Sequence, residues 1–287
     1  MPELPEVQTI VNDLSKVVLH KKIKKVEIRL SKILKCSSQN FQAILEGNSF
    51  QKISRSGKFI IIQLSKKNKY LVLHLRMTGQ IIYTDKEKII VGGHSVENNQ
   101  FDLPHRHTHL IIYFQDQSRL FYNDQRQFGF WQVVNAEELQ KIKDRLGVDP
   151  LSPKFNLFGL KKLLEHRKGN IKSFLLNQKY IAGLGNIYTD ESLFQAHILP
   201  FRKVNTLTAK DIKKLYKSIK DILNLSIKYR GTTFNNYVDA KGRKGKFTKF
   251  LKVYKKEGQK CFGCHKGIIQ KVKIIGRGTR YCSYCQK

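Results

Sequence analysis

The spacing of apolar residues changes along the chain and predicts two kinds of segment in the first half. Residues 3–19 carry apolar side chains at helical intervals, and Pro2 and Pro5 fall where the start of a helix tolerates proline. From about residue 23 to residue 134, runs of Ile, Val, Leu, Phe and Tyr are short, alternating or continuous, and separated by turn residues. This second pattern is typical of an antiparallel β-sandwich.

A helical period returns after GVDPLSP at 147–153, whose glycine and prolines indicate a domain boundary. Helices are expected at 157–166, 170–178, 186–196 and 208–229. We therefore predict an α+β multidomain protein. Its parts are an N-terminal antiparallel β-sandwich domain with a leading helix (1–146), a helical domain (147–235), and a basic loop followed by a C-terminal cysteine module (236–287).

The net charge indicates a polyanionic partner. The 287 residues include 54 Lys and Arg against 22 Asp and Glu, a formal net charge of +32. A general enrichment in lysine could raise this total, but residues 241–287 hold 15 basic residues and a single acid, Glu257. Because no segment joins such charge to a long apolar helical stripe, nucleic acid is favoured over a membrane surface.

The apolar runs are too short to cross a membrane, since the longest, such as 59–64 and 70–75, have the length of strands. The start, MPELPEV, lacks the basic and apolar regions of a signal peptide. Four of the five cysteines form two pairs near the C-terminus, and Cys36 is expected to pack as a small hydrophobic residue. We expect a reducing, cytoplasmic setting.

The cysteine pairs have the spacing of a zinc ribbon. Cys261 and Cys264 are separated from Cys282 and Cys285 by 17 residues, and each pair has two residues between its members. Two disulfides or a redox pair are the alternatives, but four thiolates in two such pairs can close a tetrahedron around Zn²⁺. We predict one structural zinc ion, because four thiolates leave no open position for water.

The second residue offers a chemical possibility. A small residue at position 2 permits removal of the initiator Met, which would leave Pro2 with a free secondary amine whose reference pKa is near 8. Such an amine can attack a sugar C1′ and form an iminium. Glu3 and Glu6 share a helical face, where they could transfer protons or simply complement the helix dipole. Spacing alone leaves both readings open.

Several motifs, in order along nearly the whole chain, carry a resemblance to a known family. After MPELPEV come RSGKF (55–59), HLRMTG (74–79), HRHTH (105–109), DQRQFG (124–129), GVDPL (147–151), LLNQKYIAGLGNIYTDE (175–191), RGTTF (230–234) and the closing YCSYCQK. The chain thereby resembles the bacterial formamidopyrimidine-DNA glycosylase (8-oxoguanine DNA glycosylase) family.

This resemblance implies a bifunctional DNA glycosylase and AP lyase of base-excision repair. It would remove 8-oxoguanine and formamidopyrimidines from duplex DNA through an imine on Pro2 and cut the strand by β,δ-elimination. The resemblance also implies a helix-two-turn-helix in the helical domain. We expect a monomer that binds damaged double-stranded DNA. No nucleotide cofactor is expected, because AGLGN lacks the strand–GxGxxG–helix context of a dinucleotide loop.

The resemblance also implies roles for individual residues. Pro2 would be the nucleophile, Glu3 would assist opening of the sugar, Glu6 would support it, and Lys58 would contact the lesion or its phosphate. Met77, Arg126 and Phe128 would fill the space left by a nucleotide that is flipped out of the duplex. The remaining DNA contacts would be phosphate contacts from Asn186, Arg277, Lys172 and His107.

Two other functions remain possible from the sequence. One is the related endonuclease VIII-like activity on oxidised pyrimidines, against which MPELPE and DQRQFG argue. The other is a non-catalytic zinc-ribbon protein that coats or bends DNA, which would leave MPELPE without a purpose. A second metal site at His105, His107 and His109 is disfavoured, because alternating histidines alone give an incomplete ligand set.

The sequence departs from the family pattern at three places. Residues 85–104 form a polar, glycine-bearing stretch that is expected to be a long loop. Arg230–Gly231 replaces a glycine pair, and Lys255–Lys256 stands where a Gly–Arg pair is common. The last two changes concern the loop thought to cover the flipped base, so they bear on base preference and leave the chemistry unaffected.

Overall fold

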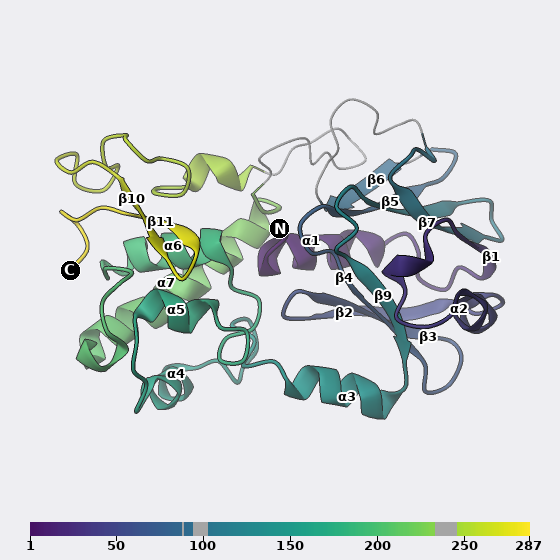
Figure 1. The fold of residues 1–287 in the computed structure, drawn as a ribbon, viewed down its shortest axis with the longest axis horizontal. Coiled ribbons are helices and arrows are strands. Elements are labelled where there is room, and N and C mark those ends of the chain that lie inside the picture. Colours follow the sequence, from purple (N-terminus) through teal and green to yellow (C-terminus); the bar gives the residue numbers. More distant parts are fainter. Residues whose placement is uncertain (88, 94–102, 233–245) are drawn as a thin grey trace. The chain divides into compact units, whose positions relative to one another are not determined.

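The structure, a computed structural model, describes residues 1–87, 89–93, 103–232 and 246–287 (Figure 1). The chain divides into two compact units. Unit 1 consists of Met1–Asp144 together with Tyr229–Thr248, and unit 2 consists of Arg145–Lys228 together with Lys249–Lys287. Each unit is therefore assembled from two separate stretches of sequence.

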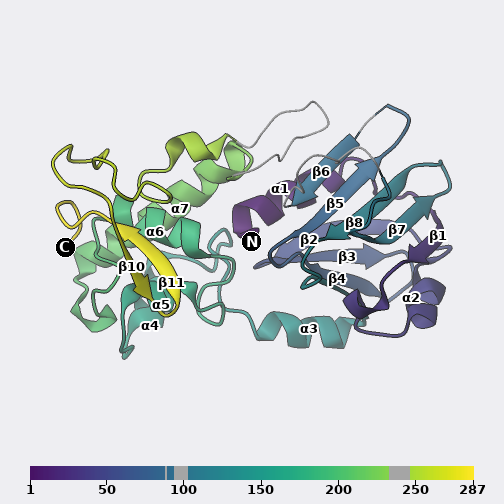
Figure 2. The ribbon, with the colours of Figure 1, turned by 45° about the horizontal axis from the view of Figure 1, so that its top comes forward.

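Unit 1 contains two antiparallel sheets (Figure 2). The five-stranded sheet has the order β1 (Ile23–Ile28), β7 (Thr108–Phe114), β8 (Arg119–Asp124), β5 (Gly79–Thr84) and β6 (Ile89–Gly93). The four-stranded sheet has the order β2 (Phe50–Ser56), β3 (Phe59–Leu64), β4 (Tyr70–His74) and β9 (Phe130–Val134). Every adjacent pair of strands runs antiparallel.

Apolar side chains from both sheets meet in one core. Ile60 and Leu71 from the four-stranded sheet are buried with Ile81 and Ile112 from the five-stranded sheet. Ile111, the neighbour of Ile112 in β7, packs instead into a separate cluster, as expected when successive strand residues point to opposite faces. The predicted antiparallel β-sandwich is confirmed.

The leading helix, α1 (Leu4–Leu14), packs its apolar side chains into this core. It begins at a capping box, in which the carboxylates of Glu3 and Glu6 each accept the backbone N–H of the other residue. It ends earlier than the predicted residue 19, and the Ser15 hydroxyl donates 2.7 Å to the Val11 carbonyl at its last turn. The other helices of unit 1 are η1 (Ser31–Ile33), α2 (Ser38–Leu45) and α3 (Ala136–Asp144).

The expectation of a loop over 85–104 is wrong for part of that stretch, which contains strand β6. Residues 88 and 94–102 lie outside the described residues. The glycines that argued against a strand have a packing role, because a Cβ on Gly92 would lie 2.8 Å from the side chain of Ile10 in α1. Glycine therefore lets this strand contact the helix closely.

Unit 2 is helical, with a two-stranded hairpin near its end. Its elements are α4 (Leu157–Leu164), α5 (Ile171–Leu176), α6 (Asn186–Gln195), η2 (Val204–Thr206), α7 (Ala209–Lys228), β10 (Gln270–Ile274) and β11 (Arg277–Tyr281), with η3 (Phe247–Phe250) spanning the border of the units. The four predicted helices begin and end within two residues of expectation. Among the described residues, no helix is both long enough and apolar enough to cross a membrane.

Candidate functional site

The amine at the start of the chain lies in a partly buried, charged environment. Pro2 and Glu3 are buried, and Met1 is exposed. Burial is the main cause that lowers the pKa of the Met1 ammonium, and the positive charge of Lys58 lowers it further. The carboxylates of Glu3 and Glu6 act in the opposite direction and raise it. The structure therefore brings these predicted residues together around the end of the chain.

The carboxylate of Glu6 joins α1 to the distant segment at 231–232. Glu6 Oε2 accepts the Glu3 N–H at 3.0 Å, while Oε1 accepts the backbone N–H and the hydroxyl of Thr232 at 2.8 and 3.0 Å. A Cβ on Gly231 would lie 2.7 Å from Glu6 Oε1, so glycine is needed for this approach. Both acidic residues thus serve the helix start, and Glu6 also holds Thr232.

His74 is a member of this site that the sequence reasoning did not single out. It is the last residue of β4 and packs between Phe59 and Phe130, at ring-centroid distances of 4.9 and 6.1 Å. Burial lowers its pKa to about 3, helped by the charges of Arg76 and Lys58. A neutral ring beside Lys58 offers a hydrogen bond without adding another positive charge. Its place at the head of HLRMTG was the available signal.

The three residues expected to enter the DNA stack lie together on the surface of unit 1. Met77 and Phe128 are 41% and 53% exposed, which is unusual for large apolar side chains. The Arg126 guanidinium lies 4.7 Å from the centroid of the Phe128 ring, and its Nη1 lies 3.0 Å from the Met77 sulfur. We call Met77, Arg126 and Phe128 the wedge.

The histidines at 105–109 differ in their environments. His109 is buried, and its Nε2 is 2.8 Å from the Asp124 carbonyl. His107 is half-buried, with its Nε2 3.1 Å from Arg106 Nε, and its pKa is lowered by burial and then by the charge of Arg106. Among the described residues, the one cluster with the geometry to hold a metal is made of cysteines.

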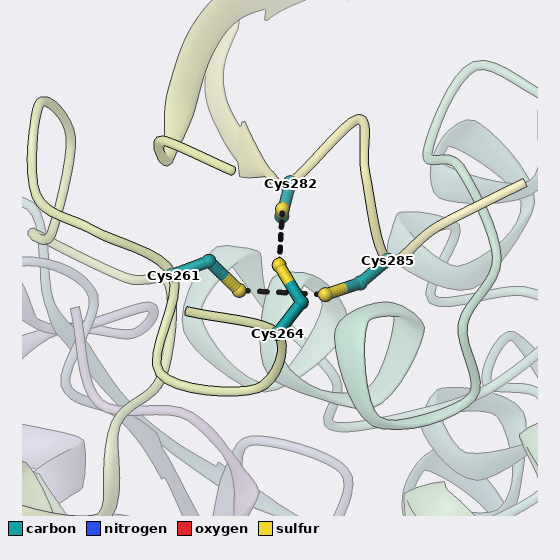
Figure 3. A group of neighbouring side chains, drawn as sticks. All are labelled: Cys261, Cys264, Cys282 and Cys285. Atoms are coloured by element: carbon teal, nitrogen blue, oxygen red, sulfur yellow. Dashed lines mark hydrogen bonds between the residues drawn. The ribbon is translucent and has the colours of Figure 1, made fainter. Parts of the chain in front are cut away.

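That cluster lies in unit 2 and joins the two CxxC pairs (Figure 3). The Sγ atoms of Cys261 and Cys285 are 3.4 Å apart, those of Cys264 and Cys282 are 3.9 Å apart, and all four lie within 4.8 Å of one another. These separations are too long for disulfides, whose S–S bond is about 2 Å. They agree with the edges of a tetrahedron of thiolates around a metal bound at about 2.3 Å.

The assignment of Lys172 as a phosphate contact is wrong. Its side chain is fully buried, and its Nζ lies 2.6 Å from Asp190 Oδ1 and 3.4 Å from the Gly278 carbonyl. The partner lies 18 positions away in the sequence, so spacing alone could not reveal the pair. A lysine held in this way joins α5 to α6 inside unit 2 and is not exposed at its surface.

Asn186 shares the Gly278 carbonyl with Lys172 of this buried pair, and Arg277 precedes Gly278 in the chain. Asn186 begins α6, and its Nδ2 donates 2.8 Å to the Gly278 carbonyl in β11. Arg277 is exposed and directly follows the left-handed residues Ile275 and Gly276, which turn the β10–β11 hairpin. The backbone of the ribbon is therefore fixed to α6 next to an exposed guanidinium.

Glu191 is a second residue that the sequence reasoning missed. It is buried in α6, and its carboxylate accepts the backbone N–H groups of Lys252, Val253 and Tyr254 at 2.9, 3.0 and 2.8 Å. Burial raises the pKa of Glu191 against the effect of these donors. The carboxylate fixes the chain that leads into the cysteine module. An acidic pair at the end of NIYTDE was the only sequence signal.

Comparison with known proteins agrees with this architecture. The N-terminal domain family of formamidopyrimidine-DNA glycosylase matches residues 1–131, and the H2TH domain family of the same enzyme matches residues 146–237. The formamidopyrimidine-DNA glycosylases of Pelotomaculum thermopropionicum and Mycoplasma mobile are each 39% identical to the chain, with 100% of the chain and 99% of each relative covered.

Solved structures give the same result. A complex between a mutant of the Lactococcus lactis enzyme and DNA containing Fapy-dG is similar with a TM-score of 0.87, at 33% identity and with 100% of both chains covered. A complex between the Lactococcus lactis enzyme and DNA containing an abasic site has a TM-score of 0.85, at 33% identity over 99% of both chains.

Fold, site and relatives together define a class of enzyme, the DNA glycosylases that also act as AP lyases in base-excision repair. Within that class, the chain belongs to the formamidopyrimidine-DNA glycosylase family. The resemblance seen in the sequence motifs is confirmed.

Proposed function

We propose that this enzyme excises oxidised purines, 8-oxoguanine and formamidopyrimidines, from duplex DNA and then cuts the strand through an imine on Pro2. The observation that supports this proposal best is the environment of the amine. Pro2 and Glu3 are buried at the start of α1, and the charges of Glu3, Glu6 and Lys58 all act on the amine that precedes Pro2. The nitrogen that removal of Met1 exposes on Pro2 would therefore lie among the same groups.

The reaction uses the amine that removal of Met1 gives to Pro2. Its nitrogen forms a bond to C1′ of the damaged nucleotide, and the bond from C1′ to the base breaks, so the electron pair leaves with the base, which takes up a proton. Opening of the C1′–O4′ bond, with a proton delivered to O4′, gives the iminium. The iminium acidifies C2′–H, and loss of that proton expels the 3′ phosphate by β-elimination. Loss of a second proton, from C4′, then expels the 5′ phosphate by δ-elimination.

We assign the proton to O4′ to Glu3, which is buried beside the amine. Glu6 supports the site by fixing Thr232 and the first turn of α1. Lys58 supplies positive charge for the lesion or its phosphate. His74 lies beside it and is neutral, so it adds no second positive charge that would repel the cationic iminium.

The wedge has the chemistry required to hold a duplex open. Flipping a nucleotide out of the stack costs a few kcal/mol, and an apolar group that fills the vacated space recovers part of that cost. Met77 and Phe128 are already exposed, and Arg126 between them can donate to the base left unpaired, which we take to be cytosine.

We assign phosphate binding to Asn186 and Arg277 in unit 2 and to His107 in unit 1, and we place one structural Zn²⁺ between Cys261, Cys264, Cys282 and Cys285. The β-sandwich domain (1–146) would carry catalysis, the helix-two-turn-helix domain (147–235) would grip DNA, and the zinc finger with its preceding basic loop (236–287) would complete the grip. The enzyme would act as a monomer in the cytoplasm, where chromosomal DNA of the bacterial relatives lies.

Borohydride trapping tests the nucleophile. The mature protein, incubated with duplex containing 8-oxoguanine opposite cytosine and then reduced, should become covalently bound to the DNA. A matched variant with one extra residue before Pro2 should not, because its Pro2 nitrogen would be an amide. Trapping by the extended variant would overturn the assignment to Pro2.

Two further measurements separate the other functions. Faster cleavage of thymine-glycol duplex than of 8-oxoguanine duplex would favour an endonuclease VIII-like enzyme. Mass spectrometry that finds Met1 retained on the mature protein would favour a non-catalytic DNA-binding protein. We expect a mass that lacks Met1 and a preference for 8-oxoguanine.

A further inference from the structure

Asp124 is a fully buried carboxylate at the end of β8, where the loop that carries Arg126 and Phe128 begins. Its two oxygens accept hydrogen bonds from four groups. Oδ1 accepts the Thr78 hydroxyl and, at 3.3 Å, the Arg126 backbone N–H. Oδ2 accepts the Gly129 backbone N–H at 2.8 Å and the Tyr122 hydroxyl at 3.2 Å.

These bonds join two loops that are far apart in the sequence. Thr78 directly follows Met77, and its hydroxyl oxygen also accepts the Arg126 backbone N–H at 3.0 Å. Arg126 and Gly129 flank Phe128 in the chain. One buried side chain therefore fixes the backbone on both sides of the wedge.

The surroundings of Asp124 leave little freedom for another arrangement. His109, itself buried, holds the Asp124 carbonyl at 2.8 Å through Nε2. A Cβ on Gly129 would lie 1.8 Å from the Tyr122 hydroxyl and 3.0 Å from Asp124 Oδ2, so a side chain at 129 would displace the tyrosine hydroxyl that donates to this carboxylate. The glycine that closes DQRQFG thus serves the Asp124 site.

We propose that Asp124 is a positioning residue for the wedge: it sets the relative placement of Met77, Arg126 and Phe128 before DNA binds. The inference rests on the proposed function, in which the wedge enters the duplex stack. Ordering two exposed loops on binding would cost conformational entropy, and a carboxylate with four preformed hydrogen bonds removes that cost in advance. Asp124 contacts the wedge only through backbone and Thr78, so it acts on the reaction indirectly.

The test compares two substrates that differ in their need for the wedge. Duplex with 8-oxoguanine opposite cytosine requires a nucleotide to be flipped out and the stack to be filled. A single-stranded oligonucleotide with a preformed abasic site has no partner strand and leaves no such hole. Asp124→Asn keeps the size of the side chain but turns one acceptor into a donor that faces other donors.

We expect Asp124→Asn to cleave the duplex about 10- to 100-fold more slowly, since hydrogen bonds to a charged group are among the stronger ones. Cleavage of the single strand should change by no more than about 3-fold, because the amine and its neighbours are untouched. Adding Arg126→Ala to Asp124→Asn should slow duplex cleavage little further, because both changes disable the same element.

Thr78→Val is a milder second variant for the case that Asp124→Asn folds poorly. It keeps the shape of the side chain but removes the hydroxyl that donates to Asp124 and accepts the Arg126 backbone N–H. It should show the same substrate selectivity with a smaller loss. Equal losses on both substrates, or fully additive losses with Arg126→Ala, would overturn the positioning role. Wild-type protein that cleaves neither substrate would instead overturn the proposed function, and this inference with it.

Discussion

The Nζ of Lys172 lies 2.6 Å from Oδ1 of Asp190, and neither side chain is exposed to solvent. The other carboxylate oxygen of Asp190 accepts the Arg280 backbone N–H at 3.0 Å. The pair therefore ties α5 and α6 to strand β11 of the ribbon. Burial raises the pKa of Asp190, and Lys172 opposes that rise by favouring the carboxylate.

Removing the lysine alone should be costly. Lys172→Met leaves the Asp190 charge buried without its cation, and we expect a loss of about 3–5 kcal/mol in the free energy of unfolding. Denaturant titration measures this loss. Lys179→Met, at an exposed lysine of the same unit, is the matched control and should change stability by less than about 0.5 kcal/mol. A Lys172→Met variant as stable as the control would contradict the structural role.

Acid should destabilise the protein through His74. Its folded pKa of about 3 lies below the ordinary value of 6.5, so between these pH values the unfolded chain binds a proton that the folded chain does not. This contribution to stability is full above pH 6.5 and falls by up to about 1.4 kcal/mol per pH unit as the pH decreases. Asp190 has a raised pKa, so its protonation in acid favours the folded state and partly offsets the effect of His74. The effect of His74 is therefore measured by comparing wild type with a variant that lacks this histidine.

His74→Asn isolates this effect, since the asparagine oxygen can still accept the Arg76 N–H that His74 Nδ1 accepts at 2.9 Å. Unfolding free energies measured from pH 4 to pH 7 should depend less steeply on pH in the variant than in wild type. His166→Asn, at an exposed histidine, is the control. Parallel curves for wild type and His74→Asn would refute the assignment.

Metal removal should affect unit 2 selectively. We expect one zinc ion per chain by elemental analysis and, after chelation or in Cys264→Ser, loss of DNA binding with melting of the β10–β11 hairpin, because such modules need the metal to fold. Cys36→Ser, at a half-buried cysteine of unit 1, should keep both the metal and DNA binding. Undiminished DNA affinity in the metal-free protein would show that DNA binding does not need the metal.

Arg230 occupies a backbone conformation that favours glycine. Its φ is 64°, and its guanidinium forms an ion pair with Asp13 of α1, with Nη1 3.2 Å from Oδ1. Arg230→Ala loses the pair and keeps the strain, whereas Arg230→Gly loses the pair and relieves it. We therefore expect Arg230→Gly to be more stable than Arg230→Ala by about 1 kcal/mol in thermal or denaturant unfolding. The reverse order would show that the strain is negligible.

The fold was predictable where local signals were complete. Helix α5 could be placed because an apolar period coincides with a capping residue, Asn170, whose Oδ1 accepts the Ser173 N–H at 2.8 Å. Strand β6 could not, because its glycines lower strand propensity and are explained only by contact with Ile10. Such a contact depends on the tertiary structure and leaves no periodic trace in the sequence.

The residues of the candidate site also divide into those with a local sequence signal and those whose role depends on tertiary contacts. Glu3, Glu6 and Lys58 were predictable because they lie inside motifs, and the structure places them around one amine. Lys172 also lies inside a motif, but its burial depends on Asp190, which only the folding of α5 against α6 brings near. Motifs thus selected the candidate residues, whereas the burial and contacts of each side chain required the packed structure.

The assembly of unit 1 from two stretches has a consequence for synthesis. Tyr229–Thr248 belongs to unit 1, and it supplies Thr232 to Glu6 and Arg230 to Asp13. A ribosome delivers these partners only after the intervening chain of unit 2 has emerged. The amine end, translated first, is therefore among the last parts of the nascent enzyme to reach its final form, and a gene fragment that stops at Asp144 would never complete it.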